Sequence, residues 1–333
     1  MTPRRESGSL LIISLSLVAI LAVLAVAVAR HLSFDVRLTR SRLARGQAEA
    51  LARGGVYLAM QRLSRDGAEA DGKTYDWLGD DWTVFPSPDP HAETSLWVVP
   101  FPAEGRPAGR FTGELRIRIT DEARRLALNG SSVEELARLT GDAVIAQEIL
   151  DARDEPDAAE DHPGDTPPYF AKNGPFVAPE ELGDLADMTP EIYETLRAST
   201  SPYPSAADPL NLNTVMPEVL RAVGLSEGGI GLVTQFRDGP DGAEAHGEDG
   251  VFTEAGLAIL ETLKDREGVD LTGTDDGNLL VSDRFGVTSG TFTVISEGVI
   301  DRPPVRARVE AVIRRTGCGA SVPEPCLIAW REG

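Results

Sequence analysis

Cysteine and histidine are scarce in this chain of 333 residues, which contains two cysteines and four histidines. There is no C-x-x-C pair and no cysteine–histidine cluster, so a zinc site is not expected. Glycine-rich phosphate-binding loops and the Gly-x-Ser-x-Gly nucleophile motif are also missing. The sequence therefore predicts a protein that is not an enzyme.

Charge is missing from residues 9–29, where three serines are the only polar side chains. As a helix this run would be roughly 30 Å long, which is about the hydrocarbon thickness of a bilayer. A short basic leader, residues 1–8, precedes it and ends in Gly8. Such a junction is where a prepilin peptidase cuts, and we predict cleavage between Gly8 and Ser9. The apolar helix would then stay on the mature protein.

Two other interpretations of this N-terminus stay open. A secretory signal peptide also has a basic start, an apolar centre and an A-x-A-like end, here Ala25–Ala27. A plain membrane anchor needs only the apolar length and the basic residues Arg4 and Arg5 on the cytoplasmic side. The prepilin interpretation is favoured because the helical pattern continues through residues 30–65 without a proline. A signal peptide has no reason to continue in that way.

In this continuation, apolar residues recur at a spacing of seven or eight, and most arginines lie elsewhere around the helix. The recurring residues are Val36, Leu43, Leu51 and Leu58. We expect one helix of roughly 85 Å over residues 9–65. Three glycines weaken it, and we expect them to mark close packing against a sheet: Gly46, Gly54 and Gly55.

Strand-like segments flank a central block of short helices. They cover residues 82–85, 95–101 and 111–120 before the block, and residues 291–298, 305–314 and 327–330 after it. Within the block, Ser132 and Glu135 form a capping-box signature. Strands on both sides of a helical block most economically belong to one antiparallel sheet, with the block inserted into it.

The chain is strongly acidic, with a net charge of −21. Residues 211–237 have the pattern of a helix-hairpin-helix unit, which in DNA-binding proteins presents main-chain N–H groups to a phosphate. Here Ser226 replaces the second hairpin glycine, Glu227 follows, and no lysine lies between Lys172 and Lys264. Since phosphate affinity depends on positive charge, a structural hairpin is favoured. A membrane-anchored periplasmic DNA-binding protein of the competence type is the alternative function.

Residues 142–165 contain nine acidic side chains and one arginine. Hard cations such as Ca²⁺ bind six to eight oxygen ligands, so Ca²⁺ is the cofactor that this segment suggests. Asp151 and Asp154 can share a helix face, and Glu160 and Asp161 would fold back from the following loop. These four residues are the candidate ligands, and a solvated acidic loop is the alternative.

The two cysteines, Cys318 and Cys326, stand near the C-terminus with glycines and prolines around them. In an exported domain such a pair is typical of a disulfide that closes a small hairpin loop. Two free thiols are the alternative.

Several short motifs follow one another along nearly the whole chain. They are Gly8–Ile13, Asp121–Asn129, Leu150–Asp154 with Ala159–Asp161 and Tyr169, Asn173–Phe176 with Glu180–Leu182, Leu210–Thr214, and Ile328–Glu332. In this order they resemble protein K of the type II (general) secretion pathway, a minor pseudopilin family. Most pilins carry glutamate at the fifth mature position. This chain has Ile13 there, a departure that is typical of protein K.

The resemblance implies a subunit at the tip of a short periplasmic pseudopilus, which initiates or caps its assembly for export across the outer membrane. A subunit at the tip has no neighbouring subunit above it and so needs no carboxylate to pair with one. A bulky insertion would obstruct the stacking of a further subunit. The implied partners are the other minor pseudopilins, the major pseudopilin, prepilin peptidase and the inner-membrane secretion platform, and no nucleic acid. The implied location is the bacterial inner membrane, crossed once, with the bulk of the chain in the periplasm. A related type IV pilus system stays open.

Taken with these patterns, the resemblance predicts an α+β fold. A long transmembrane and amphipathic N-terminal helix would pack on an antiparallel pseudopilin-type sheet that carries a large all-α insertion of helix-hairpin-helix or SAM-like type. The expected segments are the cytoplasmic leader 1–8, the transmembrane helix 9–29, its amphipathic continuation 30–65, the first part of the sheet 66–120, the helical domain 121–286 and the second part of the sheet 287–333.

Overall fold

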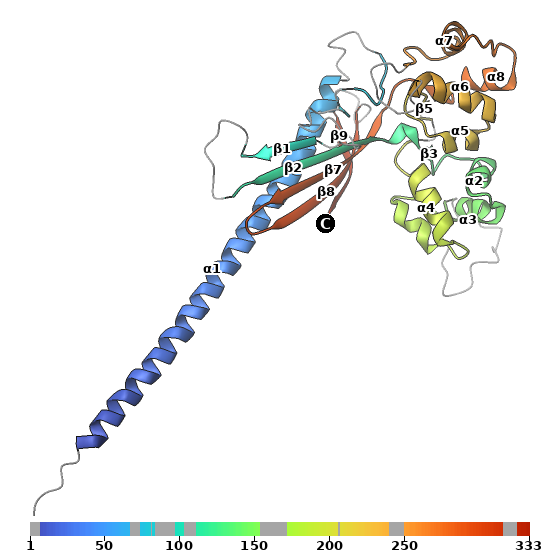
Figure 1. Cartoon of the computed structure of the whole chain (residues 1–333). Helices are drawn as coiled ribbons and strands as arrows, with labels where there is room; N and C mark the ends of the chain where they lie inside the picture. The colour runs from blue at the N-terminus through green and yellow to red at the C-terminus, as the bar shows by residue number, and fades with distance from the viewer. Residues whose placement is uncertain are drawn as a thin grey trace, which may run out of the picture.

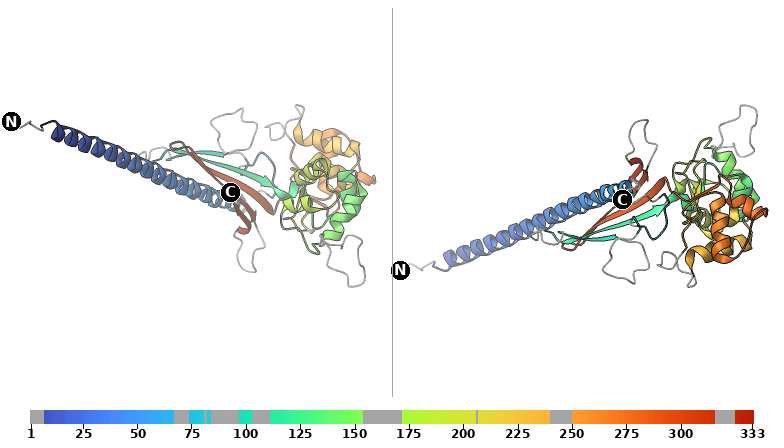
Figure 2. Two further views of the ribbon diagram at one scale, coloured as in Figure 1. Left: turned by 90° about the horizontal axis from the view of Figure 1, so that it is seen from below. Right: turned by 90° about the horizontal axis from the view of Figure 1, so that it is seen from above.

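The structure is a computed structural model of the chain, and it describes residues 7–66, 74–80, 82–83, 97–102, 111–153, 172–205, 207–239, 250–315 and 325–333. One helix, α1 (Ser7–Asp66), is 60 residues long. Its first half projects away from the rest of the molecule, and its second half lies along a sheet (Figure 1). A block of short helices lies beyond the sheet, at the end opposite the N-terminus (Figure 2). The predicted long helix is confirmed.

The sheet has five antiparallel strands in the order β1-β2-β7-β8-β9. These are β1 (Trp97–Phe101), β2 (Gly113–Asp121), β7 (Thr291–Ile300), β8 (Val305–Arg314) and β9 (Cys326–Glu332). The central pair, β2 and β7, brings together segments from the two sides of the helical block, with Ile117 opposite Ser296. The prediction of one sheet with a helical insertion is therefore confirmed.

One predicted strand, residues 82–85, is wrong at the residues that the structure describes. Trp82 and Thr83 lie in a turn, where Thr83 Oγ1 donates to the carbonyl oxygen of Asp80 at 2.8 Å. Trp82 is instead fully buried and meets the Phe292 ring edge-on, with ring centroids 5.1 Å apart.

The face of α1 that packs on the sheet is made of small residues. Ala44, Ala48, Ala52, Val56, Ala59 and Leu63 are all fully buried there. The larger residues that recur along the helix do not form this face: Val36 and Leu43 are exposed, and Leu51 and Leu58 are only half-buried. Small side chains let the helix backbone approach the strands closely, whereas the larger ones lie at or beyond the margin of this contact.

Of the three glycines predicted to mark this contact, one does so. A Cβ atom at Gly55 would overlap the side chains of Ser296 and Leu115, while Gly46 and Gly54 have no other atom within 4 Å of that position. The sheet contributes a matching glycine, Gly298 on β7, whose Cβ would overlap the carbonyl oxygen of Ala48. Helix and sheet therefore touch backbone to backbone.

The helical block has its own core, separate from the one under α1. Its helices are α2 (Val133–Thr140), α3 (Ala143–Arg153), α4 (Pro190–Ser199), α5 (Pro217–Val223), α6 (Glu227–Asp238), α7 (Leu257–Glu267) and α8 (Asp275–Leu280), with the 3-10 turns η1 (Glu122–Arg124) and η2 (Pro179–Asp184). Two short parallel pairs cross-link it, β3 (Leu126–Ala127) with β4 (Thr200–Ser201), and β5 (Leu210–Asn211) with β6 (Phe285–Gly286). The predicted capping box at Ser132 and Glu135 is confirmed.

Candidate functional site

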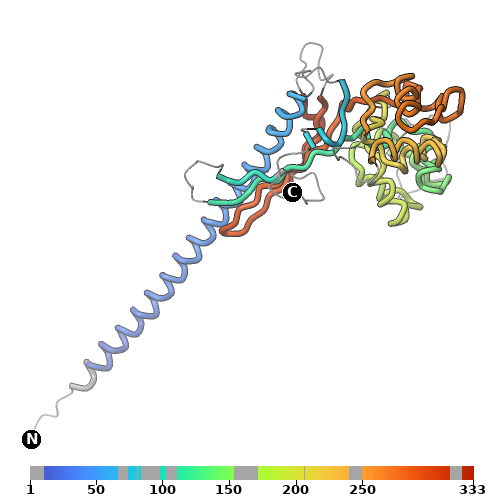
Figure 3. Tube along the Cα trace, turned by 45° about the horizontal axis from the view of Figure 1, so that its top comes forward, coloured from blue at the N-terminus to red at the C-terminus, as the bar shows by residue number. Residues whose placement is uncertain are grey.

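The outer half of α1 is an uncovered apolar surface. Every residue from Leu11 to Leu43 is exposed, and the most apolar window has a mean hydropathy of 3.0 with none of it buried. This half of the helix projects away from the rest of the chain (Figure 3). The helix is long and apolar enough to cross a membrane. Ile13, at the fifth position after the predicted cleavage, is 61% exposed. The cleavage pair Gly8 and Ser9 lies in the first turn of α1, and its processing stays a prediction.

A polar hub lies where the sheet meets the helical block, around Asp121 at the end of β2. Its carboxylate is buried and accepts hydrogen bonds from Thr214 Oγ1 at 2.5 Å, Ser289 Oγ at 2.6 Å and Ala123 N at 2.8 Å. Asn211 Nδ2 donates to the same Ser289 hydroxyl at 2.8 Å. Two motifs that are 93 residues apart in the sequence thus meet at one carboxylate. Burial raises the pKa of Asp121 to about 6.

We expect Asp121 to make the protein less stable as the pH rises from about 4 to about 6. The pKa of Asp121 is higher in the folded state than its ordinary 3.8, so the folded protein holds this proton more tightly. Its contribution to stability is therefore largest below pH 4 and is lost as the pH passes 6. Between these two pH limits the shift lowers the free energy of unfolding of the wild type by about 3 kcal/mol. In Asp121→Asn this pH-dependent change is absent. Urea unfolding of both proteins at several pH values measures it, and identical pH profiles would contradict the assignment.

A second motif pair meets at Asn129, which follows β3. Asn129 Nδ2 donates to the carbonyl oxygen of Phe176 at 2.9 Å, and Asn129 Oδ1 accepts from Phe176 N at 2.7 Å. The motif that ends at Asn129 and the motif that ends at Phe176 are therefore joined by hydrogen bonds in the folded chain.

The C-terminal motif joins β9 to both other parts of the molecule. Arg331 Nη1 donates to Glu180 Oε1 on η2 at 2.7 Å, a hydrogen bond that lowers the pKa of Glu180. The neighbouring Glu332 accepts from Arg53 Nε on α1 at 2.9 Å. One edge strand thus contacts both the long helix and the helical block.

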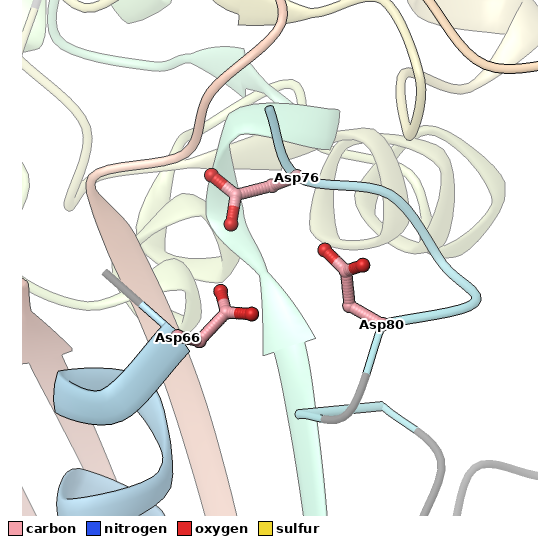
Figure 4. A group of neighbouring side chains, drawn as sticks. All are labelled: Asp66, Asp76 and Asp80. Atoms are coloured by element: carbon pink, nitrogen blue, oxygen red, sulfur yellow. The ribbon is translucent and has the colours of Figure 1, made fainter. Parts of the chain in front are cut away.

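Three carboxylates gather at the end of α1, those of Asp66, Asp76 and Asp80 (Figure 4). Arg315, just after β8, supplies a positive charge to this group, since its Nη1 lies 2.8 Å from Asp76 and its Nη2 lies 3.3 Å from Asp66. Asp80 accepts from the indole Nε1 of Trp82 at 3.3 Å. The positive charge of Arg315 compensates the negative charge of these carboxylates, which explains how they can be so little exposed to solvent.

The predicted helix-hairpin-helix is formed by α5 and α6, with Gly224 in the left-handed conformation between them. The carboxylate of Asp276 on α8 accepts from Ser226 N at 2.9 Å and from Ser226 Oγ at 2.5 Å. An acidic group thus occupies the place where a DNA-binding hairpin would hold a phosphate. This arrangement weighs against the DNA-binding alternative.

The candidate calcium ligands are only partly described. Asp151 lies on α3 and accepts from Gln147 Nε2 at 2.8 Å, while Asp154, Glu160 and Asp161 lie outside the described residues. The calcium site therefore stays a prediction. Cys326 is disulfide-bonded, but Cys318 lies outside the described residues, so the predicted pair is likewise untested.

No protein-family model matches this chain. Over 248 residues it is 29% identical to the type II secretion system protein K of Pseudomonas aeruginosa, an alignment covering 66% of this chain and 68% of that protein. Its fold resembles a chain in the crystal structure of the GspK-GspI-GspJ complex from enterotoxigenic Escherichia coli, with a TM-score of 0.60 and 16% identity. That match covers 89% of this chain and 99% of the other, and at this identity it establishes the fold alone. The sequence similarity and the shared fold together support one assignment for this chain, a minor pseudopilin of the protein K family.

Proposed function

We propose that this minor pseudopilin works at the tip of the pseudopilus of a type II secretion system, where it initiates or caps assembly. It would be held in the inner membrane by a single span, residues 9–29, with the rest of the chain in the periplasm. Its work is mechanical, with no chemistry of its own. The proposal includes the Ca²⁺ site predicted at Asp151 and its neighbours.

The observation that carries this proposal is a set of exposed apolar side chains on the amphipathic part of α1 beyond the membrane span. Leu32, Phe34, Val36 and Leu38 are exposed, and the exposed stretch runs on to Leu43. Leu43 lies about 20 Å along the helix from residue 29, too far to be covered by the hydrocarbon of the same bilayer. Leu32, Val36 and Leu43 share one side of the helix, and neighbouring subunits are the natural cover for exposed apolar side chains of this kind.

Two further features support a place at the tip. The helical block is the widest part of the molecule and lies beyond the sheet, where the next subunit would have to stack (Figure 2). Ile13 stands where a carboxylate would be needed to pair with the N-terminus of a neighbour. Both features allow contacts below this subunit and hinder contacts above it.

The proposed partners are the other minor pseudopilins, by analogy with the complex in which GspK stands with GspI and GspJ. Contacts with the major pseudopilin, prepilin peptidase and the inner-membrane platform belong to the same proposal. The acidic charge of −21 gives no reason to expect nucleic acid among them.

The test is the N-terminal sequence of the membrane-extracted chain before and after treatment with prepilin peptidase. We expect Met1 before and Ser9 after, because the cut falls between Gly8 and Ser9 and leaves the apolar helix in place. Gly8→Glu should abolish the cut, and Ser7→Ala should leave it unchanged. A mature N-terminus near Arg30 would instead identify a secretory signal peptide and contradict the proposal.

A further inference from the structure

The strand β9 forms one of the two edges of the sheet and carries an unusual share of exposed apolar side chains. Leu327, Ile328 and Trp330 are 38%, 41% and 39% exposed. Among the described residues after Leu43, only four other large apolar side chains are exposed, namely Tyr57, Val144, Val177 and Leu257. They are scattered over the molecule, whereas three lie together on a strand of seven residues.

The charged residues of β9 do not protect this edge. Edge strands usually carry outward charges that discourage pairing with another chain. Both charged side chains of β9 are instead paired within the protein. Arg331 makes a bidentate ion pair with Glu180, and Glu332 makes one with Arg53. The apolar side chains between Cys326 and Arg331 are left facing solvent.

The main chain of β9 also has free hydrogen-bonding groups. Arg308 on β8 and Gly333 exchange both main-chain bonds, at 3.0 and 3.3 Å. Because bonded and non-bonded pairs alternate in an antiparallel ladder, Arg331 is bonded to β8, and the N–H and C=O groups of Trp330 and Glu332 point away from it. No main-chain hydrogen bond to these groups is present in the described part of the chain.

The usable edge has a defined length. The pairing passes from Val312 with Ala329 to Ile313 with Leu327, so Ile328 is an extra, bulged residue. The open ladder therefore runs from Ala329 to Gly333, about 17 Å. That length matches a short added strand.

We propose that the open edge of β9 receives an extended segment of a neighbouring minor pseudopilin as an added strand. Unpaired N–H and C=O groups in extended geometry are matched by another extended backbone. Trp330, the large apolar side chain on this ladder, favours a segment with a β-branched or aromatic residue opposite it. This inference rests on the proposed assembly function and names the surface that assembly would use.

Residue-resolved amide hydrogen exchange distinguishes an added strand from a contact of side chains. The full chain is measured in detergent, alone and with the two other purified minor pseudopilins of the same system. We expect exchange of the Trp330 and Glu332 amides to slow about tenfold or more in the complex, and that of Ala329 and Arg331, already bonded to β8, to stay unchanged. Uniform protection along β9, or none, in a complex that has formed overturns this inference and leaves the proposed function standing.

A matched pair of variants tests the same hydrogen bond by affinity. Glu332→Ala and Glu332→Pro both lose the ion pair with Arg53, but only proline lacks the outward N–H, and this N–H makes no bond to β8. We expect the proline variant to bind the partner subunits about tenfold more weakly than the alanine variant. Equal affinities would overturn the inference.

Two other outcomes are equally informative. If the chain alone shows the alternating protection as its concentration rises, the occupant of the edge is a second copy, and the partner named here is wrong. If the three subunits form no complex at all, the inference fails, and the N-terminal processing test judges the proposed function separately.

Discussion

Replacing Gly298 with alanine is expected to destabilise the protein by about 1–3 kcal/mol, the usual cost of overpacking a tight interface. The added methyl group would overlap the carbonyl oxygen of Ala48 and the Cβ atom of Leu51. Both atoms are fixed to the backbone of α1, so the helix must move away from the sheet. Gly290→Ala is the matched control, since no atom lies within 4 Å of its Cβ position.

A second pair on α1 tests the same contact from the other side. Gly54 and Gly55 are neighbours in the same helix, and alanine should gain about 1 kcal/mol of helix propensity at either position. At Gly54 nothing opposes the gain, whereas at Gly55 the methyl group meets Ser296 and Leu115. We expect opposite signs, with Gly54→Ala more stable than the wild type and Gly55→Ala less stable.

Urea unfolding monitored by tryptophan fluorescence is the measurement, because Trp82 is buried in the same core. If Gly298→Ala and Gly290→Ala unfold at the same urea concentration, the helix and the sheet do not approach as closely as described.

The fold was largely predictable from local patterns, but the packing face of α1 was not. Alternation in β2 predicts that Leu115, Ile117 and Ile119 share a buried face, and the structure confirms this. Leu43 and Leu51 follow an equally regular spacing, yet they do not form the buried face. Periodicity identifies an apolar face without saying what covers it, and alanines such as Ala48 give no comparable signal.

The hub at the base of the helical block was predictable only in part. Asp121 and Thr214 both belong to motifs in the family resemblance, but their contact depends on how the chain returns to the sheet. Ser289 of the hub also donates its main-chain N–H to Asp76, but these two residues are 213 positions apart and belong to no motif. α7 and α8 have weak signals in the sequence, since Gly256, the residue before α7, offers no side-chain cap and α8 has only six residues.

Removing the guanidinium of Arg315 is expected to have the largest effect of a single substitution, about 3–5 kcal/mol of lost stability, because a buried ion pair loses one partner. In Arg315→Met the carboxylate of Asp76, which is 2% exposed, would lose the cation that now lies 2.8 Å away. Nearby Asp66 would add like-charge repulsion. Arg308→Met on β8 is the matched control, since Arg308 is 50% exposed beside Glu310 and its loss should cost at most about 1 kcal/mol.

The double variant Arg315→Met with Asp76→Asn separates lost charge balance from lost packing. If an unpaired carboxylate causes the damage, neutralising Asp76 should recover about 1–3 kcal/mol of it, and the two substitutions will be non-additive. Thermal melting of the four proteins at pH 7 measures this coupling. Purely additive losses would mean that Arg315 stabilises the fold through its contact with the Phe292 ring, 4.6 Å away, and that the three aspartates are balanced by another cation. Non-additive losses would show that the charge balance at this cluster helps to join the end of α1, the segment around Asp76 and the end of β8.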